Sequence, residues 1–384
     1  MTRILFLCST LGVGGRERQL ALLLPELRTL GFDPFVATLR HQGPHFEALE
    51  RQGVATRFVA MRSRVDLAGI VRAYRLWRLE PDVVFTSSVD AQVIGHLIAA
   101  RAGAAHLTVE HGGAGLPRAL HRRLLVRAVA PKIDRVVAIS ATQLDELHRL
   151  GFRAERITVI PNGIPAPAPA RPREAVREEL GLAEDGVLAL LVATLRPEKR
   201  AEVFVEAVRR GHAQEPRLRG VIVGGGPQLV HVQALAAEAP DVVRALGERS
   251  DVPDLIEAAD VVCLTSSFEG LPMTVLEAMA LSRPVVAMRV GGIPDAVEEG
   301  RTGKLIPPGD TDAFAEALVA LAREPASRRA MGEAASAAYR ERYTLKAMAE
   351  RYGEVLAGLA DRNAVPARRC GATQGGKGPL SWPR

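Results

Sequence analysis

The sequence predicts an α/β protein built from two doubly wound parallel sheets, one in each half of the chain. Short runs of valine, isoleucine and leucine alternate with longer amphipathic stretches, which is typical of strands covered on both faces by helices. A stiff proline-rich connector, PAPAPARP at 165–172, interrupts this alternation, which then restarts. The length of 384 residues accommodates two domains of ordinary size.

The apolar runs locate the strands, and the amphipathic stretches locate the helices between them. In the first half the expected strands are 4–8, 35–39, 54–61, 83–87, 106–110, 135–140 and 157–161. In the second half they are 186–194, 220–225, 243–246, 261–265, 284–290 and 304–307. The helices that the pattern favours most clearly are 16–31, 46–51, 66–79, 200–210, 228–238, 251–258 and 272–281. Ligands of such sheets bind at the carboxyl ends of the strands, so we expect function in the loops that follow them.

The connector and the last helix set the expected domain boundaries. We place a first domain at 1–165 and a second at 166–343. A closing helix over 344–359 presents one apolar face, made of Leu345, Met348, Tyr352, Val355 and Leu356. Residues 361–384 are rich in glycine, proline and arginine, so we expect them to form a mobile tail.

The composition is that of a globular protein, with 47% hydrophobic, 24% charged and 4% aromatic residues. No apolar run reaches the roughly 18–20 residues of a membrane span. The N-terminal run ILFLC favours a first strand over a secretion signal. The cysteines, Cys8, Cys263 and Cys370, have neither metal nor disulfide spacing. We therefore expect a cytoplasmic protein without a metal site.

The formal charge of +6 is concentrated in the first half, where residues 1–165 carry 22 Lys and Arg against 14 Asp and Glu. Such an excess suits nucleic acid, a membrane surface or an anionic substrate. Aromatic residues are few and no nucleic-acid module is recognisable, so nucleic acid is not expected as a partner.

Two basic amphipathic helices in the first half favour contact with an anionic membrane. One carries Arg118, Arg122, Arg123, Arg127 and Lys132 around Leu120, Leu124, Leu125 and Val129. The other carries Arg72, Arg75 and Arg78 around Val71, Tyr74 and Trp77. Helices of this kind can lie on the inner leaflet of a membrane. In the alternative interpretation, the arginines only solvate helices whose apolar sides pack on the sheet.

The stretch 266–284 has the pattern of a phosphate-binding turn. It follows a buried strand, Gly270 breaks the apolar run, and a helix begins near Pro272. The amides and the dipole at a helix start favour an anion. The carboxylates of Glu269 and Glu277 would repel that anion, so they suit ligand hydroxyls instead. Phosphate and polyol in one pocket suggest a sugar nucleotide. The alternative is a buried turn flanked by two solvated glutamates.

A second glycine loop, GVGG at 12–15, follows the first strand and opens a helix. Glycines there allow close approach of a ligand, and the helix start favours an anion. Glu17 stands where a dinucleotide-binding fingerprint needs its third glycine, which argues against that class. A tight turn that only packs helix on strand is the alternative.

The segment E-G-L-P-x-x-x-x-E at 269–277, followed by A-M-A and R-P-V-V-A, resembles the E-x7-E signature of the retaining GT-B glycosyltransferases, in particular glycosyltransferase family 4. Further similar segments are G-G-x-E-R at 14–18, T-V-E-H at 108–111, the glycine turns at 223–227 and 247–253, and G-G-I-P at 291–294. The resemblance is dense over 186–310 and looser over 1–165. It implies two Rossmann-like domains facing across a cleft, the first for the acceptor and the second for the nucleotide sugar. It also implies that the closing helix packs back on the first domain.

The activity implied by the resemblance is transfer of a sugar from a UDP- or GDP-sugar to a hydroxyl acceptor, with retention of anomeric configuration and without cofactor or metal ion. Lipid-linked acceptors and precursors of cell-surface polysaccharide are both compatible with it. Two other classes stay open. One is a non-catalytic sugar-nucleotide-binding protein, and the other is a GT-B epimerase or phosphorylase.

The resemblance also implies roles for single residues. Lys199 and Arg196 would neutralise the leaving diphosphate, while Glu269 would bind donor-sugar hydroxyls and Glu277 the ribose. His111 would lie near the donor sugar and the acceptor, with Glu110 as a second candidate for acceptor contact. The remaining donor-binding positions would be Gly14, Gly15, Gly225, Arg249, Gly270, Leu271, Pro272 and Met273. The chain departs from the family pattern in two places, with Thr194 where an arginine is expected and Ser282 where a glycine is preferred.

Overall fold

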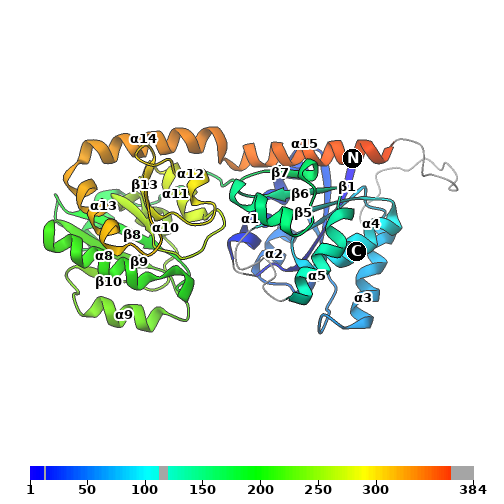
Figure 1. Cartoon of the computed structure of the whole chain (residues 1–384), viewed down its shortest axis with the longest axis horizontal. Coiled ribbons are helices and arrows are strands. Elements are labelled where there is room, and N and C mark those ends of the chain that lie inside the picture. The colour runs from blue at the N-terminus through cyan, green and yellow to red at the C-terminus, as the bar shows by residue number, and fades with distance from the viewer. Residues whose placement is uncertain (13, 112–119, 365–384) are drawn as a thin grey trace. The chain divides into compact units, whose positions relative to one another are not determined.

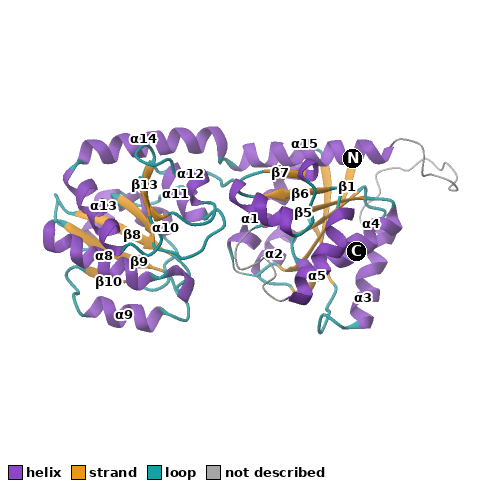
Figure 2. Ribbon diagram, in the orientation of Figure 1, coloured by secondary structure: helices purple, strands orange, loops and turns teal. Residues whose placement is uncertain are grey.

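The computed structural model describes residues 1–12, 14–111 and 120–364, which form two compact units (Figures 1 and 2). The first unit comprises residues 1–163 and the C-terminal helix α15 (Leu345–Ala364), and the second comprises residues 164–344. Arg118, Cys370 and most of the expected tail lie outside the described residues. Each unit contains one sheet with helices around it (Figure 2).

The first unit has a seven-stranded sheet in the order β3-β2-β1-β4-β5-β6-β7. Every neighbouring pair of these strands is parallel. The strands are β1 (Thr2–Thr10), β2 (Phe32–His41), β3 (Ala55–Phe58), β4 (Val83–Thr86), β5 (Ala105–Glu110), β6 (Arg135–Ala138) and β7 (Ile157–Val159). The helices are α1 (Gly15–Thr29), α2 (Pro44–Arg51), α3 (Leu67–Tyr74), α4 (Val89–Ala102), α5 (Leu120–Val129) and α6 (Leu144–Arg149).

The second unit has a six-stranded parallel sheet in the order β10-β9-β8-β11-β12-β13. Its strands are β8 (Val187–Val192), β9 (Leu218–Val223), β10 (Val243–Ala245), β11 (Val261–Leu264), β12 (Val285–Met288) and β13 (Gly303–Ile306). Its helices are α7 (Arg173–Glu179), α8 (Ala201–Gln214), α9 (Leu229–Ala237), α10 (Val252–Ala258), α11 (Met273–Ala280), α12 (Ile293–Ala296), α13 (Thr311–Arg323) and α14 (Pro325–Arg342).

All the expected strands are present, and three helices differ from the sequence-based prediction. The closing helix expected at 344–359 runs on to Ala364, so the first residues of the expected tail are helical. The helix expected at 66–79 ends at Tyr74 and continues as a 3-10 segment, Arg75–Leu79. The helix expected at 200–210 runs on to Gln214. In each sheet the strand order reverses direction once, between β1 and β4 and between β8 and β11. These two points are where a doubly wound sheet opens a crevice at the carboxyl ends of its strands.

The closing helix α15 belongs to the first unit, where it contacts α1, β4 and β5. The Tyr352 ring stacks on Phe85 with centroids 5.7 Å apart, and Phe85 meets Phe6 edge-on at 5.0 Å. The Met348 sulfur accepts hydrogen bonds from the Gly163 amide and the Gln19 side chain, each at 3.2 Å. The apolar face predicted for this helix therefore packs on the centre of the first sheet.

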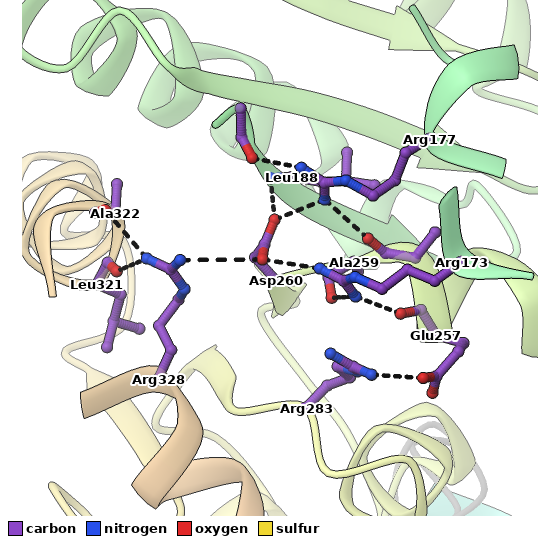
Figure 3. A network of polar contacts seen from close by, with 12 residues as sticks. Arg173, Arg177, Leu188, Glu257, Ala259, Asp260, Arg283, Leu321, Ala322 and Arg328 are labelled. Carbon is purple, nitrogen blue, oxygen red and sulfur yellow. Dashed lines mark hydrogen bonds and ion pairs between the residues drawn. The ribbon is translucent and has the colours of Figure 1, made fainter. Parts of the chain in front are cut away.

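A partly buried ionic network lies at the amino-terminal ends of the strands of the second sheet (Figure 3). Asp260 precedes β11 and accepts hydrogen bonds from the Leu188 amide at 2.8 Å and from Arg173 and Arg177 of α7 at 2.9 Å each. Arg328 of α14 approaches the same carboxylate at 4.0 Å. The arginines also donate to the carbonyls that end α10 and α13. These contacts serve the fold at the amino-terminal ends of the strands, whereas ligands of a doubly wound sheet bind at the carboxyl ends.

Candidate active site

Two loops meet at the point where the second sheet reverses direction. The loop 194–200 follows β8 and the loop 265–272 follows β11, and β8 and β11 are paired strands. The Ser267 amide donates to the Glu198 carbonyl at 2.8 Å. The Thr265 hydroxyl donates to the carbonyls of Lys199 and Arg200, each at 3.0 Å. These hydrogen bonds make the two loops one structural unit at the carboxyl ends of the strands.

Lys199 and Glu269 form an ion pair across the two loops. The Lys199 Nζ lies 2.6 Å from Glu269 Oε1, and the Ser266 hydroxyl donates to the same oxygen at 2.6 Å. The Glu269 side chain is 9% exposed and that of Lys199 is 24% exposed. No described residue donates to the second oxygen, Oε2. Oε1 of Glu269 thus accepts hydrogen bonds from Lys199 and Ser266, and Oε2 can accept a hydrogen bond from a ligand hydroxyl.

Glycines after β12 allow the Glu269 loop to close tightly. Gly291 has φ +52, and a Cβ on it would lie 1.8 Å from the Glu269 carbonyl oxygen, so no larger residue fits. The Gly292 amide donates to the Gly270 carbonyl at 2.8 Å. In the sequence, only the family resemblance linked this G-G-I-P segment to the site. The structure explains why glycine stands there, because the turn packs directly on the backbone of the Glu269 loop.

Helix α11 begins directly after this loop, with Pro272 as the residue before its first turn. Leu271 and Met273 are buried, and the Thr274 hydroxyl donates to the Val192 carbonyl at 3.5 Å, so the first turn lies against the end of β8. Glu277 follows one turn later and is partly exposed. The start of α11 therefore presents amides and a positive dipole end beside Lys199, an arrangement that favours phosphate.

Arg196 and Thr194 are held in a turn instead of an extended loop. The Arg196 amide donates to the Thr194 carbonyl at 2.8 Å, and the Lys199 amide donates to the Arg196 carbonyl at 2.9 Å. Both side chains are exposed, and the Arg196 guanidinium has no hydrogen bond or ion pair to any residue in 1–12, 14–111 or 120–364. The turn shortens the path between the two positions. That Arg196 replaces the missing arginine stays a prediction.

The turns after β9 and β10 line the same edge of the sheet. The Gly225 carbonyl accepts from the Leu195 amide at 2.7 Å, and a Cβ on Gly225 would lie 2.3 Å from the Glu248 carboxylate. Arg249 is engaged with Asp251 at 2.6 and 2.8 Å and also with Glu179, and these hydrogen bonds raise its pKa above the usual value. Its guanidinium is thus fixed within the second unit. Its expected place near the nucleobase stays a prediction.

In the first unit, Gly14 and Gly15 open helix α1 as expected, but a carboxylate already occupies this turn. Glu17 is buried and pairs with Arg16 at 2.6 Å. A Cβ on Gly14 would lie 2.5 Å from the other Glu17 oxygen, so the Glu17 side chain folds back over this glycine. The helix start is thereby partly neutralised by the chain itself, a feature that the sequence pattern did not predict.

Glu110 and His111 end β5 beside a buried glutamine. Gln92, on α4, donates to Glu110 Oε1 and, at 3.0 Å, to the Thr108 hydroxyl. Burial raises the pKa of Glu110 to about 7, although the Gln92 hydrogen bond and the Arg16 charge lower it. Burial also lowers the pKa of His111 to about 3, and its Nε2 has no partner among the described residues. Both side chains are therefore neutral between about pH 3 and 7, and Glu110 ionises as the pH rises through about 7. Gln92 was not predicted, because a buried glutamine on a helix gives no periodic signal.

The described residues contain no cluster of three His, Cys, Asp or Glu side chains that could hold a metal ion. Cys8 and Cys263 are buried free thiols in β1 and β11. Within the same described residues, no helix is long and apolar enough to cross a bilayer.

Comparison with known proteins gives two family matches that follow one another along the chain. The model described as Glycosyltransferase Family 4 matches residues 13–166, and that described as Glycosyl transferases group 1 matches residues 172–338. A D-inositol 3-phosphate glycosyltransferase from Kribbella flavida is 34% identical over 236 residues, which are 57% of this chain and 55% of that protein. An N-acetyl-alpha-D-glucosaminyl L-malate synthase from Bacillus anthracis is 28% identical, over 59% of this chain and 60% of that protein. The chain thus spans little more than half the length of these curated relatives.

Solved structures share the fold over nearly the whole chain. HepE from Anabaena, solved in complex with UDP, superposes with a TM-score of 0.82 at 22% identity, covering 93% of this chain and all of that one. A glycosyltransferase from Rickettsia africae gives a TM-score of 0.79 at 19% identity, covering 93% of this chain and 98% of that one. The two family matches follow one another along the chain as the two parallel-sheet units do, so the chain is similar to glycosyltransferases of family 4 in both units and has the GT-B fold.

Proposed function

We propose that the protein transfers a sugar from a nucleoside diphosphate sugar to a hydroxyl acceptor with retention of anomeric configuration. The observation that carries this proposal is the Lys199–Glu269 pair, 2.6 Å apart, placed where the second sheet reverses and next to the start of α11. It supplies a cation for a diphosphate and, on the neighbouring loop, a carboxylate for sugar hydroxyls. The Anabaena neighbour, which has the same fold, has been solved with UDP-glucose.

On the donor side, each role follows from the charge and position of the residue. Lys199 and the amides at the start of α11 would hold the diphosphate, with Arg196 approaching from the turn. Glu269 Oε2 would accept a hydrogen bond from a donor-sugar hydroxyl. Glu277, one turn along α11, would accept from the ribose diol. Gly225 and the segment at Arg249 would border the nucleobase.

In the proposed reaction, the bond between the anomeric carbon and the diphosphate oxygen breaks while the acceptor oxygen bonds to the same face of that carbon. The acceptor proton goes to the departing diphosphate oxygen. Catalysis then consists of positioning and of stabilising charge on the leaving group. His111 and Glu110 of the first unit are the candidates for contact with the acceptor hydroxyl. The cations and amides named above make a divalent cation unnecessary in this proposal.

One observation favours a second candidate, a protein that binds sugar nucleotides without turning them over. Thr194 stands where the family pattern has an arginine, and the exposed Arg196 replaces it only if its side chain reaches the diphosphate. A binder would retain Glu277 and lose leaving-group stabilisation.

A donor panel tests the proposal. The protein is incubated with UDP- and GDP-sugars and a mixture of hydroxyl acceptors in excess chelator, and products are identified by mass spectrometry and by the proton coupling of the anomeric position. We expect product in chelator, with the donor's configuration, from the wild type and none from Lys199→Met. Inverted product, or activity only after a divalent metal is restored, would contradict the mechanism. Nucleotide binding without turnover of any donor would favour the binder.

A further inference from the structure

We propose that the solvent side of the helical layer α3–α4–α5 in the first unit is a docking face for an anionic lipid surface. The layer is continuous, because α3 contacts α4 and α4 contacts α5 (Figure 1). The three helices follow β3, β4 and β5, and right-handed crossovers place them on one face of the sheet. The inference is independent of the transfer reaction, since it concerns a surface outside the candidate active site.

Large apolar side chains are exposed on every helix of this layer. On α3 and just before it, Val65, Leu67 and Val71 are 81%, 77% and 49% exposed, and Leu67 and Val71 are four residues apart on one stripe. On α4, Leu97 is 48% exposed. On α5, Leu124 and Leu125 are 56% and 48% exposed. These six are half of the twelve large exposed hydrophobic side chains in the described part of the chain. Such a concentration marks an interaction surface.

The inner faces of the same helices explain why these side chains point outward. On α5, Val126 is buried and Val129 packs beside it in a core cluster, so the opposite side of that helix carries Leu124 and Leu125. On α3, Ala73 is buried, and Tyr74 packs on the core. The sheet is already covered, and the exposed leucines and valines form a second, unpartnered apolar side.

The charge of the layer is complementary to anionic headgroups. Residues 61–79 contain five arginines and one acidic residue, and residues 120–132 contain four basic residues and no acidic one. Arg62, Arg75, Arg127 and Lys132 are exposed and have no ion pair with any described residue. Cations around exposed leucines are what a peripheral helix uses on an anionic leaflet. A second copy of this chain is disfavoured as the occupant, because the same basic excess would then face itself.

The structure also corrects the sequence-based choice of residues. Trp77 packs on the core and is stacked by Arg101 at 4.1 Å, while Arg72 donates to the Val59 and Ala60 carbonyls. Trp77 and Arg72 are therefore engaged within the first unit and do not belong to the docking face. Val65, Leu67 and Leu97, which the sequence analysis did not single out, take their place. The side chains of residues 120–122 lie outside the described part of the chain.

Vesicle flotation with the full chain tests the proposal. We expect the partition coefficient on vesicles containing half phosphatidylglycerol to exceed that on pure phosphatidylcholine by about tenfold or more at low salt, and to fall in high salt. Leu124→Ser with Leu125→Ser should lower it about tenfold, and Arg75→Ala about fivefold. Val230→Ser is the matched control, since Val230 is 79% exposed on α9 of the second unit, and it should bind as the wild type does.

Three outcomes would overturn the proposal. The wild type does not bind anionic vesicles at low salt, or the Leu124/Leu125 double variant binds them as well as the wild type does. In the third outcome, Val230→Ser lowers the partition coefficient as much as the double variant does. Light scattering on the same samples measures whether the face instead binds a second copy of this chain. A wild-type dimer that the double variant abolishes, without vesicle binding, would show a face for a second copy. Circular dichroism of each variant verifies folding, and a second double variant, Leu67→Ser with Val71→Ser, repeats the test on another helix.

Discussion

Neutralising Glu269 should tighten the binding of a nucleoside diphosphate, and it should favour the bare nucleotide over the sugar conjugate. In the free protein Lys199 is committed to Glu269, with Nζ and Oε1 2.6 Å apart. Glu269→Gln keeps the size of the side chain and can still accept from Ser266, but it releases the lysine and removes a negative charge that repels the diphosphate. Lys199→Met has the reverse effect, because it leaves the Glu269 carboxylate without its cation.

The expected magnitudes follow from charge-assisted hydrogen bonds between partly buried groups. Releasing Lys199 should tighten binding of the bare nucleotide by about 1–2 kcal/mol, or roughly 5- to 30-fold. The sugar conjugate should gain less or lose affinity, because its hydroxyl no longer finds a carboxylate. Lys199→Met should weaken the bare nucleotide by about 2–3 kcal/mol, since one charged donor is lost and an unpaired carboxylate remains.

Calorimetric titration of both variants with UDP, GDP and the corresponding sugar conjugates measures these differences. Thermal unfolding of each variant is the control for folding, since Glu269 is only 9% exposed. If Glu269→Gln weakens the bare nucleotide as much as Lys199→Met does, then Lys199 is not the diphosphate cation and the pair is only structural.

Further expectations follow from single residues. Glu277→Ala should weaken nucleoside diphosphate binding by about 2–4 kcal/mol in calorimetry, the order of two charge-assisted hydrogen bonds, and an unchanged affinity would remove the ribose assignment. Arg196→Ala should lower kcat about 10²- to 10³-fold, and Thr194→Ala should have little effect. Equal small effects of both would leave Lys199 as the only candidate side-chain cation for the diphosphate and would favour the non-catalytic binding protein. The pKa of Glu110 is raised to about 7, so the neutral carboxyl stabilises the fold at low pH and this contribution is lost as the pH rises towards 7. Between pH 4.5 and 7.5 the unfolding free energy of the wild type should fall by at most about 3 kcal/mol more than that of Glu110→Gln. If the unfolding free energies of the two proteins change in parallel with pH, burial does not raise the pKa of Glu110. Ser282→Gly should raise the unfolding free energy by about 0.5–1 kcal/mol, because Ser282 has φ +56, and no gain in denaturant titration would show that the strain is absent.

The strands could be predicted because parallel strands covered on both faces are continuous apolar runs, such as VLALLV in β8. Helix α14 gives a much weaker signal. Its buried side is made largely of small residues, including Gly332, Ala335 and Ser336, so apolar and polar positions differ little along the sequence. Gly332 is small for a reason that only the fold shows, since a Cβ there would lie 2.1 Å from the Ser282 carbonyl oxygen.

The site could be predicted only as separate loops. Lys199 and Glu269 are 70 residues apart, and the sequence placed each of them after a buried strand. The order β8-β11 makes those strands neighbours, and that order is decided by tertiary packing. The same holds for Gln92 and Glu110, whose contact depends on α4 lying beside β5. Family resemblance supplied roles, whereas the ion pair that joins two of those roles came from the structure.

Hydrogen–deuterium exchange with and without nucleotide tests most directly where the donor binds. UDP or GDP should slow exchange in the peptides that contain 194–200 and 265–277, and this protection should disappear in Glu277→Ala at the same nucleotide concentration. Protection confined to the glycine loop at 12–15, or protection in the second unit that Glu277→Ala leaves intact, would contradict the assignment of the donor site to the loops after β8 and β11.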